Sequence, residues 1–234
     1  MVLSLWPAAS LAHDPAEAPR KDEPRVKAAR AEQADTLRRL YAAASVAYPP
    51  RALLLRVFKL DDVLEVWALP AKGERYVLVE SIPVCARSGG PGPKRREGDL
   101  QVPEGYYRIS AFNPWSNFLL SMKVDYPNAA DRKRSSAPRL GGDIFIHGSC
   151  VTIGCVPLGD EAISRLYVSA QDTAHAGGRV DAHLYPARLD AAHQAALVEA
   201  AAGDAALLAF WDELRPGYAW FEARRTLPRV KIDG

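Results

Sequence analysis

The sequence predicts an α+β, mainly β fold: a β-sandwich-like domain with flanking helices at both ends. Between residues 49 and 188, short apolar segments with period-two patterning alternate with Gly, Pro and Asp turns, which is typical of sandwiches and barrels. Alanine-rich segments with helical spacing precede and follow this region. With 234 residues, of which 48% are hydrophobic, the chain can bury a substantial core.

Four segments are expected in chain order. Residues 1–12 contain the apolar run "VLSLWPAASLA", which ends in small residues like a secretory signal, lacks a preceding positive charge and is too short to span a membrane. Residues 13–48 form a polar lead that becomes helical at "AEQADTLRRLYAAA". Residues 49–188 form the β-rich domain, and residues 189–234 a helical extension packed on it. Export would place the protein in an oxidising compartment.

Strand patterns divide the β-rich domain. The stretch "LLLRVFKLDDVLEVWAL" predicts two strands joined at Asp61 and Asp62. Further strands are expected at "YVLVESIPV", "GYYRISAF", "FLLSMKV", "DIFIHG" and "RVDAHLY". Gly and Pro dominate from Ser88 to Gly105, which predicts a long loop of the kind that borders functional sites.

Helices are expected after Gly159 and at the end of the chain. Asp160 is expected to cap a helix that continues through "EAISRLYVSA". From Asp190 the chain is expected to be helical to about Leu214, followed by a final turn or helix at "PGYAWFEARR". Docking against the core, rather than on a membrane, is the favoured role of its aromatic residues, Trp211, Tyr218, Trp220 and Phe221.

The charge balance excludes one class of partner. With 30 Lys and Arg against 28 Asp and Glu, a net charge of +2 gives no reason to expect nucleic acid as the main partner. Two basic clusters, 94–96 and 132–134, could meet an anionic substrate or simply be solvated loops. No apolar stretch is long enough for a transmembrane span.

The segment "IFIHGSCVTIGCVPLGDEAI" contains the parts of a thiol nucleophile site. His147 ends an apolar strand, where its ring would be held as the base, and Gly148 leaves the backbone open. Cys155 follows Gly154, which permits a tight turn whose N–H groups could face an oxyanion. A zinc site or an inert buried cysteine beside a satisfied histidine would also fit the spacing alone. His175 and His183 are expected to be surface or strand residues.

Several motifs in order resemble the L,D-transpeptidase catalytic domain (YkuD-like) family, in its YafK-type branch. These are "IFIHGSCVTIGCVPLGDEAISRLY", "GPKRREGDLQVPEGYYRIS", "FNPWSNFLLSMKVDYPNAAD" and "FWDELRPGYAWFE", so the resemblance covers residues 50–225. It implies a sandwich-like catalytic domain, in agreement with the strand pattern. A papain-like peptidase would place its cysteine first and its histidine far downstream, whereas here the histidine comes first and close.

The resemblance implies a role for each residue of this loop. Cys155 would be the nucleophile that forms an acyl-enzyme thioester, and His147 its base and later its acid. Gly148 would orient the imidazole through its carbonyl. Gly154 and Cys155 would donate backbone N–H groups to the oxyanion, and Thr152 would add a supporting hydroxyl. No metal and no cofactor are implied.

The chain departs from the wider family at two positions. Ile153 stands where a second histidine is usual, and Pro157 stands where an arginine usually follows the Cys-Val pair. The cationic contact of that arginine would then be lost or supplied from elsewhere, with Arg95, Arg96 and Arg108 as the candidates.

The implied substrate is the stem peptide of peptidoglycan, attacked at the carbonyl of its third-position diamino acid. A diamino acid amine, the lysine of an outer-membrane lipoprotein, or water would then accept the acyl group, which gives cross-linking, tethering or hydrolysis. Substrate contacts are expected from Lys94, Arg95, Arg96, Ser116 and Asn117, in the periplasm. An idle peptidoglycan-binding module with the same fold is the alternative from another class.

The remaining cysteines allow one structural pair. If Cys155 is a free thiolate in an exported protein, Cys85 and Cys150 are left to form a disulfide or to remain reduced.

Overall fold

Strand β1 (Ala52–Phe58) lies inside an eight-stranded mixed sheet in the computed structural model, which describes residues 23–230. Its seven residues are all buried, because β2 (Val63–Leu69) pairs antiparallel on one side and β8 (Arg179–Tyr185) pairs parallel on the other. Helices cover both of its faces. The nearly continuous apolar sequence "ALLLRVF" is what a strand buried on both faces requires.

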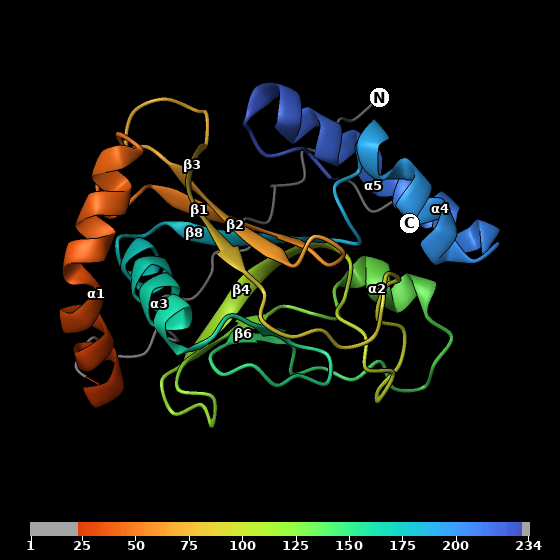
Figure 1. Cartoon of the computed structure of the whole chain (residues 1–234), viewed down its shortest axis with the longest axis horizontal. Coiled ribbons are helices and arrows are strands. Elements are labelled where there is room, and N and C mark those ends of the chain that lie inside the picture. The colour runs from red at the N-terminus through yellow and green to blue at the C-terminus, as the bar shows by residue number, and fades with distance from the viewer. Residues whose placement is uncertain (1–22, 231–234) are drawn as a thin grey trace, which may run out of the picture.

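The sheet runs in the order β3-β2-β1-β8-β4-β5-β6-β7 and curls across the molecule (Figure 1). All six expected strands beyond β1 begin or end within a few residues of their predicted positions, and the mainly β, α+β fold with helices at both ends is confirmed. The remaining strands are β3 (Val77–Pro83), β4 (Gly105–Asn113), β5 (Ser121–Val124), β6 (Phe145–His147) and β7 (Val156–Pro157).

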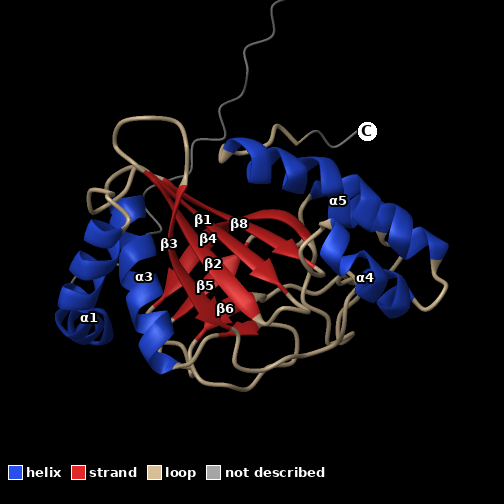
Figure 2. Cartoon of the chain, turned by 45° about the horizontal axis from the view of Figure 1, so that its top comes forward, coloured by secondary structure: helices blue, strands red, loops and turns tan. Residues whose placement is uncertain are grey.

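Two helical layers enclose the sheet (Figure 2). Helices α1 (Pro24–Ala43) and α3 (Asp160–His175) lie together on one side, where their apolar residues join Leu53, Leu55 and Val57 of β1 in the main core. On the other side lie η2 (Ala191–His193), α4 (Gln194–Ala201) and α5 (Ala205–Arg224).

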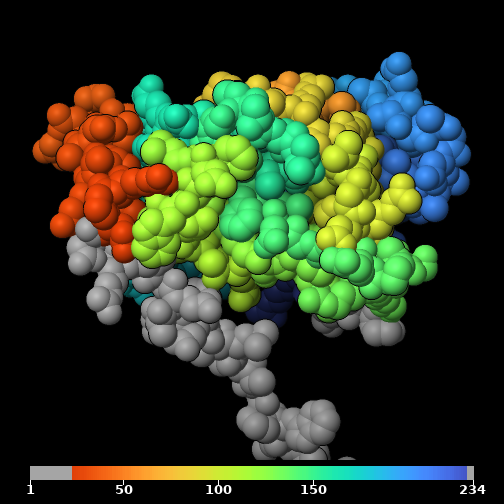
Figure 3. All heavy atoms as spheres, turned by 90° about the horizontal axis from the view of Figure 1, so that it is seen from below, coloured from red at the N-terminus to blue at the C-terminus, as the bar shows by residue number. Residues whose placement is uncertain are grey.

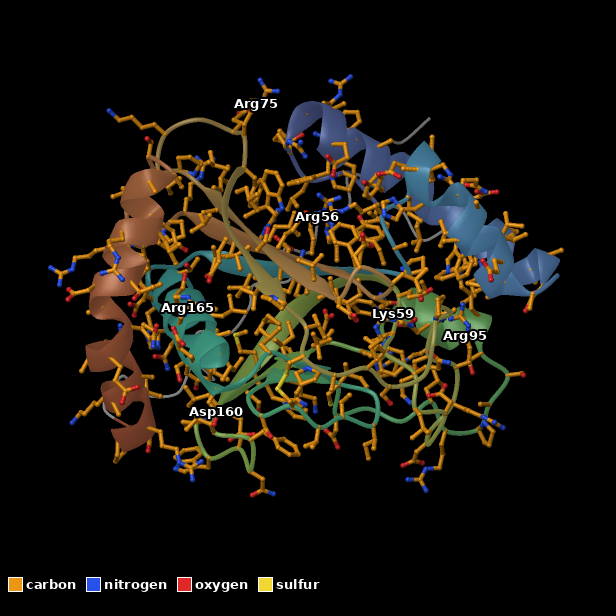
Figure 4. The ribbon with its side chains drawn as sticks, in the orientation of Figure 1. Arg56, Lys59, Arg75, Arg95, Asp160 and Arg165 are labelled. Carbon is orange, nitrogen blue, oxygen red and sulfur yellow. A yellow bond between two sulfur atoms is a disulfide. The ribbon has the colours of Figure 1, made fainter. Side chains whose placement is uncertain are left out.

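A buried arginine fastens α5 to the sheet. Arg56 of β1 is fully buried and points toward α5, where it pairs with Glu222 at 2.7 Å and with its cross-strand neighbour Glu65 at 3.3 Å (Figure 4). Its guanidinium also lies over the rings of Tyr218 and Phe221, 5.1 and 4.7 Å from their centroids. Paired carboxylates and aromatic faces together make burial of this charge tolerable.

The prediction of a helix break at Pro216 is wrong. The helix passes through this proline without ending, although proline lacks the N–H of a helical hydrogen bond. Tyr106 of β4 donates its hydroxyl to the carbonyl of Leu214 at 2.9 Å, and Gly217 leaves the space for that hydroxyl, since a Cβ there would lie 2.1 Å from it. Packing on the sheet therefore holds a segment whose sequence is typical of a break.

Other local predictions need correction. Helix α1 begins at Pro24, seven residues before the predicted start, with proline at the first turn where its missing N–H costs nothing. Gly159, not Asp160, is the N-cap of α3, and the Asp160 carboxylate instead accepts the N–H of Ser149 at 2.7 Å. The short strand β7 and the helix α2 (Ala129–Arg134) were not predicted.

Of the four aromatic residues that were expected to dock on the core, Trp211, Tyr218 and Phe221 are buried and Trp220 is 41% exposed. The apolar run of residues 1–12 lies outside the described residues. Within residues 23–230, no helix combines the length and the hydropathy needed to cross a membrane.

Candidate active site

His147 stands at the end of β6, between β5 and β7, and its side chain is almost completely buried. Its Nδ1 lies 2.6 Å from the carbonyl oxygen of Gly148. A carbonyl can only accept, so Nδ1 carries the proton and Nε2 keeps a free lone pair. The ring of Phe118 stacks on the imidazole, with 4.5 Å between the ring centroids. The histidine is thus held in the tautomer that a general base needs.

Cys155 reaches the same place from β7. Parallel pairing of Ile146 with Val156 brings the residue before Val156 beside Phe145. The Phe145 N–H lies 3.4 Å from the sulfur of Cys155, and the thiol lies 3.6 Å from the carbonyl oxygen of Asp143. Phe145, His147 and Cys155 line one pocket, and side chains two apart on a strand share a face, as Phe145 and His147 do here.

A pocket of about 230 Å³ contains both groups. The imidazole of His147 and the thiol of Cys155 lie in its wall, together with the loop of residues 113–118. A second hollow of about 80 Å³ adjoins Cys155 on another side, against the Gly- and Pro-rich residues 86–91. Cys155 therefore lines two depressions, one shared with the histidine and the other bordered by residues 86–91.

Burial opposes charge on both groups. It lowers the pKa of His147 from its usual 6.5, although the bond to the Gly148 carbonyl acts in the other direction. Burial likewise raises the pKa of the Cys155 thiol above 9.0, with the Phe145 N–H and Lys94 opposing it and Asp143 adding to it. At neutral pH these two directions favour a neutral thiol and a neutral imidazole.

The backbone N–H groups of the turn at Cys155 bond to the hydroxyl of Thr152. Gly154 has φ +132°, a region that favours glycine, and a Cβ there would lie 3.3 Å from the carbonyl oxygen of Gln101. The hydroxyl oxygen of Thr152 accepts the N–H of Cys155 at 2.8 Å and that of Gly154 at 3.3 Å, and donates to the Cys155 carbonyl at 2.9 Å. The amides predicted to face an oxyanion thus face the Thr152 hydroxyl here.

The predicted substrate contacts divide into two groups. Ser116 and Asn117 line the pocket that holds Cys155. Lys94 is buried, and its ammonium donates to Asp99 at 2.7 Å within its own loop.

The other cationic candidates lie on separate parts of the surface. Arg95 lies over the ring of Phe210, 5.0 Å from the centroid, on the side of α2 and α5 (Figure 4). Arg108 reaches toward Asp181 at 3.6 Å. Arg96 is exposed. Of the cluster 94–96, only Arg96 therefore offers an exposed cation.

Two features of the site were not predicted from the sequence. Phe118, which stacks on the histidine, lies in "NPWSNF", where only the polar residues were considered. Asp160 accepts the N–H of Ser149, which follows the end of β6 by two residues. An aromatic residue and a carboxylate close to a catalytic motif are common in any chain, so neither could be singled out without coordinates. His183 is buried in β8.

Cys85 and Cys150 form a disulfide with Cα atoms 5.4 Å apart. It joins the end of β3 to the loop between His147 and Cys155, and the sulfur of Cys85 also contacts the Ser149 carbonyl at 3.3 Å. Within the described residues no group of three or more His, Cys, Asp and Glu side chains could hold a metal ion.

Removing this disulfide should lower stability. The bond closes a loop over a sequence separation of 65 residues, so its loss should cost about 2–5 kcal/mol of unfolding free energy. We expect the double variant Cys85→Ala/Cys150→Ala to show this loss in urea unfolding. The denatured wild type should present one free thiol before reduction and three after it; three before reduction would contradict the pairing.

Comparison with known proteins finds a matching family model and a matching relative. Residues 66–180 match the family model of the L,D-transpeptidase catalytic domain, YkuD. The chain is 32% identical to the Escherichia coli (strain K12) protein named "Putative L,D-transpeptidase YafK", over 76% of this chain and 70% of that protein.

Two solved structures are more distant. The helical cell shape determining protein Pgp2 from Campylobacter jejuni is 23% identical over 57% of this chain and 47% of its own, with a TM-score of 0.47. An L,D-transpeptidase fragment from Xylanimonas cellulosilytica is 13% identical over 60% of this chain and 63% of its own, with a TM-score of 0.35.

Proposed function

Because the chain belongs to the L,D-transpeptidase catalytic domain family, we propose that it transfers acyl groups from peptidoglycan stem peptides through a thioester on Cys155. The observation that carries this proposal is the shared pocket of Cys155 and His147, with Nδ1 of the histidine bonded to the Gly148 carbonyl. A nucleophile, a base and a group that orients the base are the three parts that such chemistry needs.

The proposed acylation starts from the neutral pair. Nε2 of His147 takes the thiol proton as the sulfur attacks the carbonyl carbon of the third-position diamino acid. The oxyanion that forms is assigned to the N–H groups of Gly154 and Cys155, which the Thr152 hydroxyl occupies at rest. The tetrahedral adduct then expels the amine of the following residue, which takes the proton from His147, and leaves the thioester.

Deacylation runs the same steps with a new nucleophile. An amine or a water molecule gives its proton to Nε2 and attacks the thioester carbonyl, and the sulfur leaves and is protonated again. The two depressions beside Cys155 offer separate places for donor and acceptor. We assign Asn117 and Ser116 to the donor side and the exposed Arg96 to the carboxylates of the stem.

The family name favours a transferase that makes 3-3 cross-links or attaches a lipoprotein, and we propose the periplasm as its compartment. Hydrolysis that releases a wall-linked lipoprotein is the second candidate, because the thiol is only half-buried and water can reach it.

Product analysis decides between these acceptors. We expect disaccharide tetrapeptide to lose its terminal residue and to yield a 3-3 linked dimer detectable by mass spectrometry. Tripeptide without dimer would assign the hydrolytic activity. Binding of the stem peptide with neither product would favour the idle binding module.

The pKa directions give a pH prediction. Activity requires neutral imidazole, and the pKa of His147 lies below 6.5, so kcat/KM should stay level between pH 6.5 and 9.0 and fall only in more acid solution. Alkylation of Cys155 by iodoacetamide should accelerate up to and beyond pH 9.0, since its pKa lies above that value. A thiol that already reacts at its maximal rate at pH 6 would show an ion pair instead; Cys155→Ala supplies the blank.

A further inference from the structure

The loop between β4 and β5 contacts His147 and the residue that follows it. Phe118 stacks on the imidazole with an interplanar angle of 28°. Its carbonyl oxygen also accepts the N–H of Gly148 at 3.1 Å, so the residue that orients Nδ1 is bonded to the same loop. Any shift of Phe118 would therefore disturb both the face of the imidazole and the carbonyl on its edge.

This loop is held from outside by the N-terminal helix. Arg25, in the first turn of α1, donates from Nη1 to the carbonyl of Ser116 at 2.8 Å and to that of Leu119 at 3.2 Å. These two carbonyls flank Phe118. Figure 3 shows the loop, in lime green, lying against the red-orange helix α1. Leu119 has φ +68°, a strained conformation for a branched residue, which external bonds help to maintain.

The helix is itself anchored far from the pocket. Val26 and Tyr41 are buried in the main core, and the Tyr41 hydroxyl lies 2.6 Å from that of Ser169 on α3. Arg30 of α1 forms an ion pair with Asp172 of α3. Because α1 is fixed along its length, its first turn presents Arg25 at a defined position. Helix α1 also lies outside the matched family residues 66–180.

We propose that Arg25 is a positioning residue for catalysis: through the carbonyls of Ser116 and Leu119 it holds Phe118 against His147, and so couples α1 to the base. The inference rests on the proposed function, since it gives the role of Arg25 in that reaction. The Phe118 ring keeps water from one face of the imidazole and fixes the direction of Nε2. Without the two bonds, the loop can move and the ring becomes solvated and less well aimed.

The test compares variants that differ only in this contact. Arg25→Met removes the donor and keeps an unbranched side chain. Arg39→Met is the matched control, because Arg39 is an exposed arginine of the same helix that donates to Thr36. Phe118→Leu removes the stacked ring directly. The pKa of the His147 ring is measured by NMR titration, and kcat and KM are measured with a stem peptide.

We expect Arg25→Met to raise the pKa of His147 toward 6.5 and to lower kcat about tenfold with little change in KM. Phe118→Leu should do the same, and the double variant should be no worse than Phe118→Leu alone, because both act through one contact. Arg25→Lys should restore part of kcat. The two titratable residues close to His147, Cys155 and Asp160, are kept in every variant, so their removal cannot cause a change in the pKa of His147.

Unchanged titration and kcat in Arg25→Met would overturn the inference, as would a fall in melting temperature without either change. If wild type turns over no stem peptide, the proposed function fails, and the NMR titration still decides whether Arg25 positions the ring.

Discussion

The variant Cys155→Ala should form no acyl-enzyme and should lose stem-peptide turnover by about four orders of magnitude. The reaction requires a sulfur that can bond to the acyl carbon, and within the described chain the other two cysteines are joined in a disulfide. Intact-mass analysis of wild type with disaccharide tetrapeptide, and in parallel with a carbapenem, should show an adduct that the variant lacks.

The control for this variant is its stability. Cys155 is only half-buried and alanine leaves its backbone free, so the melting temperature should change by no more than a few degrees. An adduct that persists in a folded Cys155→Ala protein would assign the acyl group to another residue, and a wild type without any adduct would move the binding-module alternative to the front.

The variant Gly148→Ala should damage both the fold and the site. A Cβ at this position would lie 2.6 Å from the carbonyl oxygen of Phe118, 2.7 Å from Oδ1 of Asp160 and 2.9 Å from Cγ2 of Ile163. Backbone and helix lie on these sides, so the segment must move away. We expect about 1–3 kcal/mol of lost unfolding free energy from overpacking. We also expect about a 100-fold lower kcat, because the carbonyl that orients His147 moves with the segment.

Gly142→Ala is the matched control. It lies in the loop that leads into β6, and a Cβ there would meet nothing within 4 Å. Urea unfolding and stem-peptide kinetics on both variants separate the effect of the clash from that of losing a glycine. Wild-type kcat in Gly148→Ala would show that the imidazole does not depend on this carbonyl.

Local pattern was enough to predict most strands and the candidate nucleophile and base. Strand patterning records burial residue by residue, so the core strands follow from period-two and fully apolar segments. His147 and Cys155 lie within one short loop, where spacing and the surrounding glycines already limit how far apart they can be. The resemblance to a known family added their roles, which spacing alone left open beside zinc binding and an inert cysteine.

Residue patterns along the chain were thus sufficient to predict the fold class and the candidate pair of His147 and Cys155. The contacts around the imidazole became visible only in the folded chain, where the Phe118 ring stacks on it and Arg25 bonds to the loop of that ring. The continuation of α5 through Pro216 was likewise visible only there. Each of these depends on contacts between segments distant in the chain. Propensity and spacing describe residues that are neighbours along the backbone. Ring stacking on a histidine, hydrogen bonds from a distant guanidinium and the packing that supports a proline-containing helix all require separate elements to pack together.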